Sequence, residues 1–514
     1  MVSAVAIVRS WWCFVISFGL ILLPALPAMS AEASEAGSIQ LVAAVHVHSR
    51  ASTGDLTLDE LAARAEQLGI GALLLTENLA LEYEYGLRPL ESVIKAKASF
   101  PSLMKFGIEQ YLHEVEETQA RHPNVLLVPG VEVAPHYYWS GSPWDRTLTM
   151  HNAQRNLLVF GLPTAEAYRR LPALGNYGSY RRAGGWAGGL LPALLLLSAV
   201  WVGVPRLHGG LGADRPTSLG KGKVVAILCL ISAAVIIGLS NWPFGTPLFS
   251  PYEERLGFQP HQALIESVAA QGGLAFWSLP EARDFRQPSL GPLGTVTIKT
   301  DPHPEALLLT VGHQGFGGLY QEARTIHAPG GIWDQLVTLY QSGQRRLRPT
   351  MIGEIAFHSS DHAKKELDQV LTVLSVKERS LAGVLAALRE GRAYAVERYH
   401  KEFRLSLDEF HVDLGEGRKA EGPGRTIARQ GAEPIAFHAR LSTTDQRPHR
   451  VAVRVIRSGE VLAKREGDTP LDIDVTDVSL AASARAAYRL EVTGGGTGEL
   501  LSNPIYVHPS EIRS

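Results

Sequence analysis

Two histidines, His46 and His48, stand two residues apart at the end of a short apolar run that begins at Gln40. Residues two apart on a β-strand point to the same face, about 6.5 to 7 Å from one another, so both imidazoles would leave the strand on one side. Imidazole is the commonest metal ligand in proteins. With 18 His in 514 residues, chance alone supplies roughly 0.6 His-x-His pairs, so the weight of this pair depends on its surroundings.

A clear helix start follows the two histidines. Thr57 to Glu60 forms a capping box and Gly69 gives a C-terminal stop, with an apolar face made by Leu58, Leu61, Ala65 and Leu68. The run 70–75 then predicts a buried strand. A strand, His-x-His, helix and strand in this order make a βα unit, which places both histidines at the carboxyl edge of a parallel sheet, where barrel enzymes carry their chemistry.

This unit resembles the opening of the PHP family, named for polymerase and histidinol phosphatase domains. Two later stretches are similar to the same family: Pro129-Gly130-Val131-Glu132 at the end of an apolar run, and the run 350–356 followed by His358. The resemblance implies a distorted barrel with seven strands that holds divalent metals (Zn, Mn or Fe) at the strand ends. The metal ligands it implies are His46, His48, Glu132 and His358; a shifted match would use Asp361 and His362 in place of the last.

The chain departs from the family pattern at half of the ligand positions. Asn78 and Asn156 stand where the family has His, and Leu279 and Ala356 stand where His or Asp is expected. A catalytic zinc needs only three protein ligands and a water, so the remaining residues could complete one divalent ion. They could not hold a trinuclear cluster, since Leu279 and Ala356 bind no metal.

Two functions of different classes remain open. The first is a non-catalytic or weakly active PHP-like binding module with an incomplete metal site and an unknown protein partner. The second is a metal-dependent phosphoesterase that hydrolyses a small-molecule phosphate ester through a metal-activated water. Nucleic acid is not an expected partner, because 49 basic and 51 acidic residues give a formal net charge of only -2.

Three apolar runs predict the compartment. Residues 1–31, with Arg9 ahead of the run 11–26, fit a signal peptide or an uncleaved N-terminal anchor. The uncharged runs 186–204 and 224–240 would span about 28 and 26 Å as helices, which favours a transmembrane hairpin over two buried core helices. We therefore expect a protein of the cytoplasmic membrane whose domains face the periplasm or the cell exterior.

The predicted fold class is α/β: a distorted (β/α)7 barrel of PHP type, interrupted by the transmembrane hairpin and followed by a small antiparallel β-sandwich. The expected domains are 1–31, a first barrel part 38–180, the hairpin 186–242, a second barrel part 252–400 and the sandwich 401–514. Within the barrel, residues 83–122 read as helical in period, 307–311 as a strand and 332–340 as a helix.

Overall fold

The computed structural model describes residues 38–86, 95–176, 178–179, 181–182, 186–203, 221–241, 246–291, 294–359 and 365–510. The predicted signal peptide or anchor, the loop 204–220 between the two apolar runs, and the alternative ligands Asp361 and His362 lie outside these residues. Residues 37–514 belong to one compact unit.

The first half of this unit is a ring of strands. Neighbours β1, β2 and β6 pair in one sheet, while β3, β7, β10, β13, β16 and β17 pair in a second one. The ring closes where Val47, at the end of β1, pairs in parallel with Phe357, just after β17. The bounds are β1 (Ile39–Val47), β2 (Ala72–Leu75), β3 (Glu77–Asn78), β6 (Leu126–Val128), β7 (Gly130–Val133), β10 (Leu157–Phe160), β13 (Leu274–Trp277), β16 (Gly315–Leu319) and β17 (Thr350–Gly353).

One strand of the ring runs against the others. β10 pairs antiparallel with both β7 and β13, whereas β1 and β2, β3 and β7, and β16 and β17 are parallel pairs. In the β7 pairing Leu157 lies opposite Val133, so the beginning of β10 meets the end of β7. Asn156, which precedes β10, therefore reaches the same edge of the ring as Glu132.

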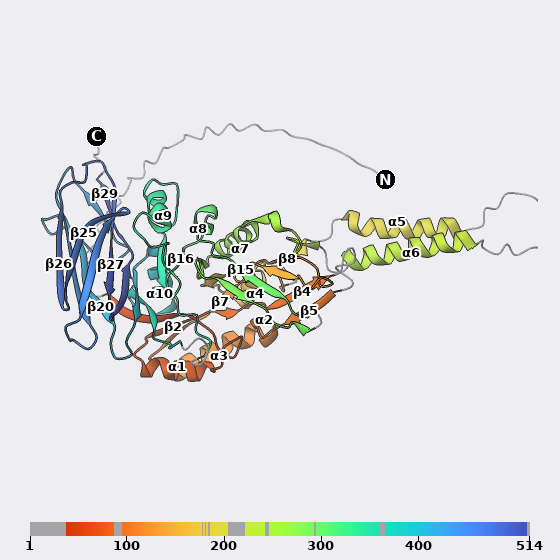
Figure 1. The fold of residues 1–514 in the computed structure, drawn as a ribbon, viewed down its shortest axis with the longest axis horizontal. Helices are drawn as coiled ribbons and strands as arrows, with labels where there is room; N and C mark the ends of the chain where they lie inside the picture. Colours follow the sequence, from red (N-terminus) through yellow and green to blue (C-terminus); the bar gives the residue numbers. More distant parts are fainter. Residues whose placement is uncertain are drawn as a thin grey trace, which may run out of the picture. The chain divides into compact units, whose positions relative to one another are not determined.

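Helices surround the ring, and the first of them follows the sequence prediction closely. In α1 (Leu58–Gln67) the Thr57–Glu60 capping box is formed, Leu58, Leu61 and Ala65 are buried, and Gly69 has φ 68°. Figure 1 shows α1 beside α3 below the strands. The remaining helices of this part are α2 (Leu103–Phe106), α3 (Ile108–Arg121), α4 (Ala165–Arg169), α7 (Gln259–Ala270), α8 (Ala306–Leu309), α9 (Ile332–Gln341) and the 3-10 turn η1 (Glu254–Leu256).

Two element predictions are wrong. The segment 83–122 is not helical throughout, because it begins with the hairpin β4 (Glu82–Gly86) and β5 (Lys95–Ser99) before α2 and α3. The expected strand 307–311 is the short helix α8, and the strand at this place in the ring is β16 instead. A smaller sheet lies beside the ring, in the order β14 (Asp284–Arg286), β15 (Thr297–Thr300), β9 (Thr149–His151) and β8 (Tyr138–Ser140), and β11 (Arg181–Arg182) pairs with β12 (Thr246–Pro247).

The predicted fold class is wrong in its membrane hairpin. The two apolar runs do form helices, α5 (Trp186–Gly203) and α6 (Lys221–Asn241), which lie side by side (Figure 1). Across the part of the chain that the structure describes, however, no helix is long and apolar enough to cross a membrane. Pro192 lies inside α5, and Lys221 and Lys223 lie in the first turn of α6.

The C-terminal part is rich in β-structure and shares a sheet with the ring. From β1 the sheet continues through β18 (Val370–Val376) and β19 (Ala393–Arg398), joined by α10 (Leu381–Glu390), to β28, β27, β29 and β22. A second sheet has the order β21, β20, β23 and β26. The bounds are β20 (Leu405–Asp413), β21 (Lys419–Glu421), β22 (Thr426–Arg429), β23 (Ile435–Thr443), β24 (Arg450–Arg457), β25 (Glu460–Asp468), β26 (Leu471–Asp477), β27 (Ala486–Gly494), β28 (Gly498–Ser502) and β29 (Ile505–Pro509).

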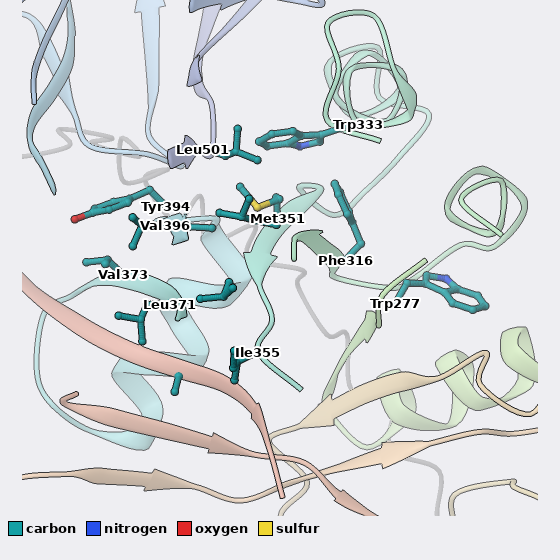
Figure 2. Packing of buried hydrophobic residues seen from close by; sticks show 14 of the residues in the cluster. Trp277, Phe316, Trp333, Met351, Ile355, Leu371, Val373, Tyr394, Val396 and Leu501 are labelled. Carbon is teal, nitrogen blue, oxygen red and sulfur yellow. The ribbon is translucent and has the colours of Figure 1, made fainter. Parts of the chain in front are cut away.

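The apolar core also runs across the predicted boundary at residue 401. Figure 2 shows Trp277, Phe316 and Met351 from the ring in the same cluster as Trp333 of α9 and Leu501 of β28. Burial of apolar surface is the main favourable term in folding, so the ring and the C-terminal strands stabilise one another.

Candidate metal centre

Three of the predicted ligands meet at one edge of the ring. His46 lies on β1, His48 just beyond it, and Glu132 on β7. Nε2 of His46 is 3.2 Å from Oε1 of Glu132, and Nε2 of His48 is 3.6 Å from its Oε2. Both histidines are fully buried, and one donor atom from each of the three residues lies within 4.8 Å of the others. The cluster has the composition and spacing that fit a divalent metal.

His48 is held from behind by a hydroxyl and a carboxylate. Its Nδ1 is 3.5 Å from Oγ of Ser52, whose hydroxyl donates to Glu77, and the amide N–H of Ser49 donates to the other oxygen of Glu77 at 2.8 Å. The Ser52 hydroxyl donates its proton to Glu77, so the Ser52 oxygen accepts from Nδ1–H of His48. Nε2 of His48 is then the nitrogen with a free lone pair. Among the described residues this buried Nε2 has no hydrogen-bond partner. Burial, and then the charge of His358, hold the pKa of His48 well below 6.5.

His46 is held by a carboxylate that sequence reasoning missed. Oε2 of Glu354 lies 2.8 Å from Nδ1 of His46 and also accepts from Oγ of Ser278 at 2.7 Å. Metal-binding histidines usually donate their second ring nitrogen to such a carboxylate. The available signal was the position of Glu354 itself, in the run 350–356 that matches the family. His46 also has φ 71°, a left-handed conformation that costs energy for a residue other than glycine.

The two asparagines at predicted ligand positions donate to Glu132. Nδ2 of Asn78 is 2.7 Å from Oε2, and Nδ2 of Asn156 is 2.5 Å from Oε1. Burial raises the pKa of Glu132, but the charges of His46 and His48 and a hydrogen bond from His46 outweigh it and hold the pKa far below its usual range. Burial lowers the pKa of His46, yet Glu132 and Glu354 raise it to about 9. The centre therefore attracts positive charge.

His358 lies beside the cluster rather than within it. Its ring stacks on that of His48, with centroids 4.1 Å apart and planes 7° apart, and its Nδ1 is 2.9 Å from Oγ1 of Thr53. Within the described part of the chain the group of converging donor atoms consists of His46, His48 and Glu132 alone. That His358 is a fourth ligand stays a prediction.

The two apolar residues at expected ligand positions have a left-handed backbone conformation. Leu279 has φ 42° and Ala356 has φ 47°, and both follow a strand of the ring, whereas His46 lies within β1 near its end. Left-handed residues other than glycine cluster at functional sites, where the surrounding structure enforces them. The ring thus bends its strand ends sharply even at positions whose side chains bind no metal.

Several solved structures match the chain at low sequence identity. A two-domain protein from Bacteroides vulgatus, described as containing a predicted PHP-like metal-dependent phosphoesterase, is 13% identical over 91% of this chain and 96% of that one, with a TM-score of 0.34. A candidate metal-dependent phosphoesterase from Bifidobacterium adolescentis is 12% identical over 62% of this chain and 87% of that one, with a TM-score of 0.27.

An amidohydrolase from Chromobacterium violaceum with bound sulfate and no metal is 16% identical over 67% of this chain and 96% of that one, with a TM-score of 0.28. No family model matches the chain. No curated protein matches it either. With TM-scores this low, the assignment of the site rests on its own geometry.

Proposed function

We propose that the chain binds one divalent metal ion through His46, His48 and Glu132 and hydrolyses a small-molecule phosphate ester. The observation that carries the proposal is the buried Nε2 of His48, which has no hydrogen-bond partner among the described residues and faces Glu132. Leaving a buried polar atom unpaired costs about 1 to 3 kcal/mol. A metal ion at this nitrogen would remove that cost.

Each side chain around the centre has a role in this proposal. A bound divalent ion would lower the pKa of a water molecule and neutralise charge on the ester. Glu354 and Ser278 orient His46, Ser52 orients His48, and the amides of Asn78 and Asn156 fix the carboxylate of Glu132. His358, half-buried beside His48, is placed to hold or move a proton. The apolar run in residues 1–31 supports a location of the protein's activity outside the cytoplasm.

A second candidate is a non-catalytic or weakly active binding module. The hydrogen bonds to Glu132 favour it, because Asn78, Asn156 and His46 already provide partners for both carboxylate oxygens. A carboxylate that is satisfied in this way needs no metal for its own stability.

Metal content and hydrolysis distinguish the two candidates. The purified chain is chelated, reloaded with Zn, Mn or Fe, and assayed for bound metal and for hydrolysis of p-nitrophenyl phosphate. The phosphoesterase should bind about one equivalent and lose both metal and activity in His48→Ala and Glu132→Gln. The exposed His113, 71% accessible, provides the control His113→Ala, which should change neither. Metal below roughly 0.2 equivalents together with no hydrolysis would leave the binding module as the better account.

A further inference from the structure

A polar cavity lies outside the metal centre. It has a volume of about 210 Å³ and lies at the beginning of β10, with Arg155, His261, Glu253 and Glu254 among its lining residues. Arg155 directly precedes Asn156, whose amide holds Glu132. None of the four lining residues serves the metal centre, so their arrangement requires a separate explanation.

Arg155 brings a hydrogen-bond donor into this cavity without an acceptor. Its Nε is buried and has no hydrogen-bond partner within the described residues, while the guanidinium carbon lies 4.9 Å from the ring centroid of Phe258. The aromatic contact holds the side chain while its Nε–H stays without an acceptor among the described residues. A guanidinium of this kind matches a carboxylate or phosphate group.

His261 adds an acceptor beside that donor. The ring is 2% exposed, and its Nε2 lies 3.1 Å from the carbonyl oxygen of Arg155. A carbonyl oxygen only accepts, so Nε2 carries the proton and Nδ1 is the acceptor nitrogen. Nδ1 has no hydrogen-bond partner in the described part of the chain. This cavity-lining histidine therefore has an acceptor nitrogen that no donor among the described residues satisfies.

Two carboxylates stand at the exposed side of the cavity. Glu253 and Glu254 are both solvent-exposed, and Oε1 of Glu254 lies 3.5 Å from the hydroxyl of Tyr138. Two negative charges against the single positive charge of Arg155 disfavour a purely anionic ligand. A ligand with neighbouring negative and positive groups would satisfy Arg155 on one side and the glutamates on the other.

We infer that this cavity binds a small zwitterion of the amino-acid type, with its carboxylate on Arg155 and its ammonium group facing His261, Glu253 and Glu254. If the proposed phosphoesterase reaction operates, on which this last step rests, the zwitterion is the non-reacting half of the substrate, because the cavity and Glu132 share the edge formed by β7 and β10.

Calorimetric titration of the intact, metal-chelated chain tests the inference. The probes are glycine and L-serine, compared with acetate, ethylammonium and inorganic phosphate. An amino acid should bind at least about tenfold more tightly than either singly charged fragment, since charge-assisted hydrogen bonds act at both ends. Arg155→Gln and the double variant Glu253→Gln/Glu254→Gln should each weaken binding by a similar factor. The matched control Arg255→Gln, an exposed neighbour outside the lining, should bind as the unaltered chain does.

Three results would overturn the zwitterion site: no preference for the amino acids over acetate and ethylammonium, tighter binding of phosphate, or unchanged affinity in the glutamate double variant. That variant alters only exposed side chains, so it remains informative if Arg155→Gln does not fold. The titration measures binding without metal or turnover. An inactive enzyme that still binds glycine would therefore refute the proposed function alone.

Discussion

Glu354 is fully buried, and its carboxylate contacts Nδ1 of His46. A carboxylate behind a metal-binding histidine orients the ring and makes it a stronger ligand. We predict that Glu354→Gln lowers metal affinity by about 10 to 100 times, as removal of such partners commonly does. Competition titration with a chromogenic chelator measures this.

Glu117→Gln, at a position 54% exposed, serves as the control for that substitution and should leave metal affinity unchanged. A purely structural role for Glu354 would instead lower the thermal midpoint of the metal-free chain with metal affinity retained. That pattern would contradict the positioning role.

His46, His48 and Glu132 were accessible to sequence reasoning because each ends an apolar strand, and strand ends of one barrel gather at one edge. Their orienting partners were not. Glu354 lies 308 residues from His46 in the chain, and Glu77 reaches His48 only through Ser52. Contacts of this kind depend on ring closure and on side-chain direction, which no local pattern encodes. Metal ligation by the three residues, and by His358, stays a prediction.

Ala356 marks the point where the chain leaves β17 and turns toward His358. Its φ of 47° is unfavourable for alanine and easy for glycine. We predict that Ala356→Gly changes the free energy of unfolding by less than about 0.5 kcal/mol. The loss of backbone strain at the left-handed position offsets the larger conformational entropy that glycine gives the unfolded chain. Urea denaturation measures the difference.

The comparison for this substitution is Ala386→Gly, at a half-buried position in the interior of α10, where a helical glycine should cost about 1 kcal/mol. Equal losses at both positions would show that the conformation at Ala356 carries no strain.

Elements with a strong local signal were predicted well, and those without one were not. α1 has a capping box, a 3.6-residue apolar period and a glycine stop, and its bounds agree with the prediction. β16 reads Gly-Phe-Gly-Gly-Leu and lacks the β-branched residues that mark strands, while the apolar run of α8 is too short to distinguish helix from strand. The reversed direction of β10 follows from tertiary pairing and has no sequence signature.

A buried ion pair joins α9 to β27 across the two halves of the molecule. Arg489 donates to Asp334 through Nε at 3.0 Å and Nη2 at 2.8 Å, and its guanidinium carbon lies 4.6 Å from the ring centroid of Trp333. We predict that Asp334→Ala lowers the free energy of unfolding by about 1.5 to 3 kcal/mol, because the buried Arg489 loses its hydrogen bonds to Asp334 while Glu491 keeps it paired. Chemical denaturation provides the measurement.

The double substitution Asp334→Leu/Arg489→Met should cost less than Asp334→Ala, since both charges of the pair are removed together and Glu491 keeps its ion pair with Arg454. The exposed pair of Arg121 and Asp59 is the control, and Arg121→Ala should cost at most about 1 kcal/mol. If Asp334→Ala and Arg121→Ala lowered the free energy of unfolding by similar amounts, burial would not explain the cost of breaking the ion pair.

Asp477 gives the C-terminal part a defined acid sensitivity. Burial raises its pKa, but hydrogen bonds from Tyr488, Arg457 and Ser479 outweigh that effect and hold the pKa at about 2. Since the folded pKa lies below the unfolded value of 3.8, the carboxylate stabilises the fold above pH 4 and loses this contribution as the pH falls toward 2. We predict that Asp477→Asn removes about 2 kcal/mol at pH 7 and flattens the pH dependence between pH 4 and 2.

Unfolding free energies measured from pH 2 to 7 test this, with the 78% exposed Asp474 as the site of a control substitution to Asn. An unchanged acid slope in Asp477→Asn would mean that other carboxylates govern acid unfolding.

The pairing of β19 with β28 has a consequence for the order in which the molecule is made. The edge of β19 is covered by residues 498–502, which follow β19 in the chain only after β20 to β27. Until they arrive, the growing polypeptide presents a strand with free backbone groups, the kind of surface that recruits other chains. The native sheet therefore forms only after residues 498–502 have been made, and we expect the polypeptide up to β27 to associate with other chains through this open strand edge.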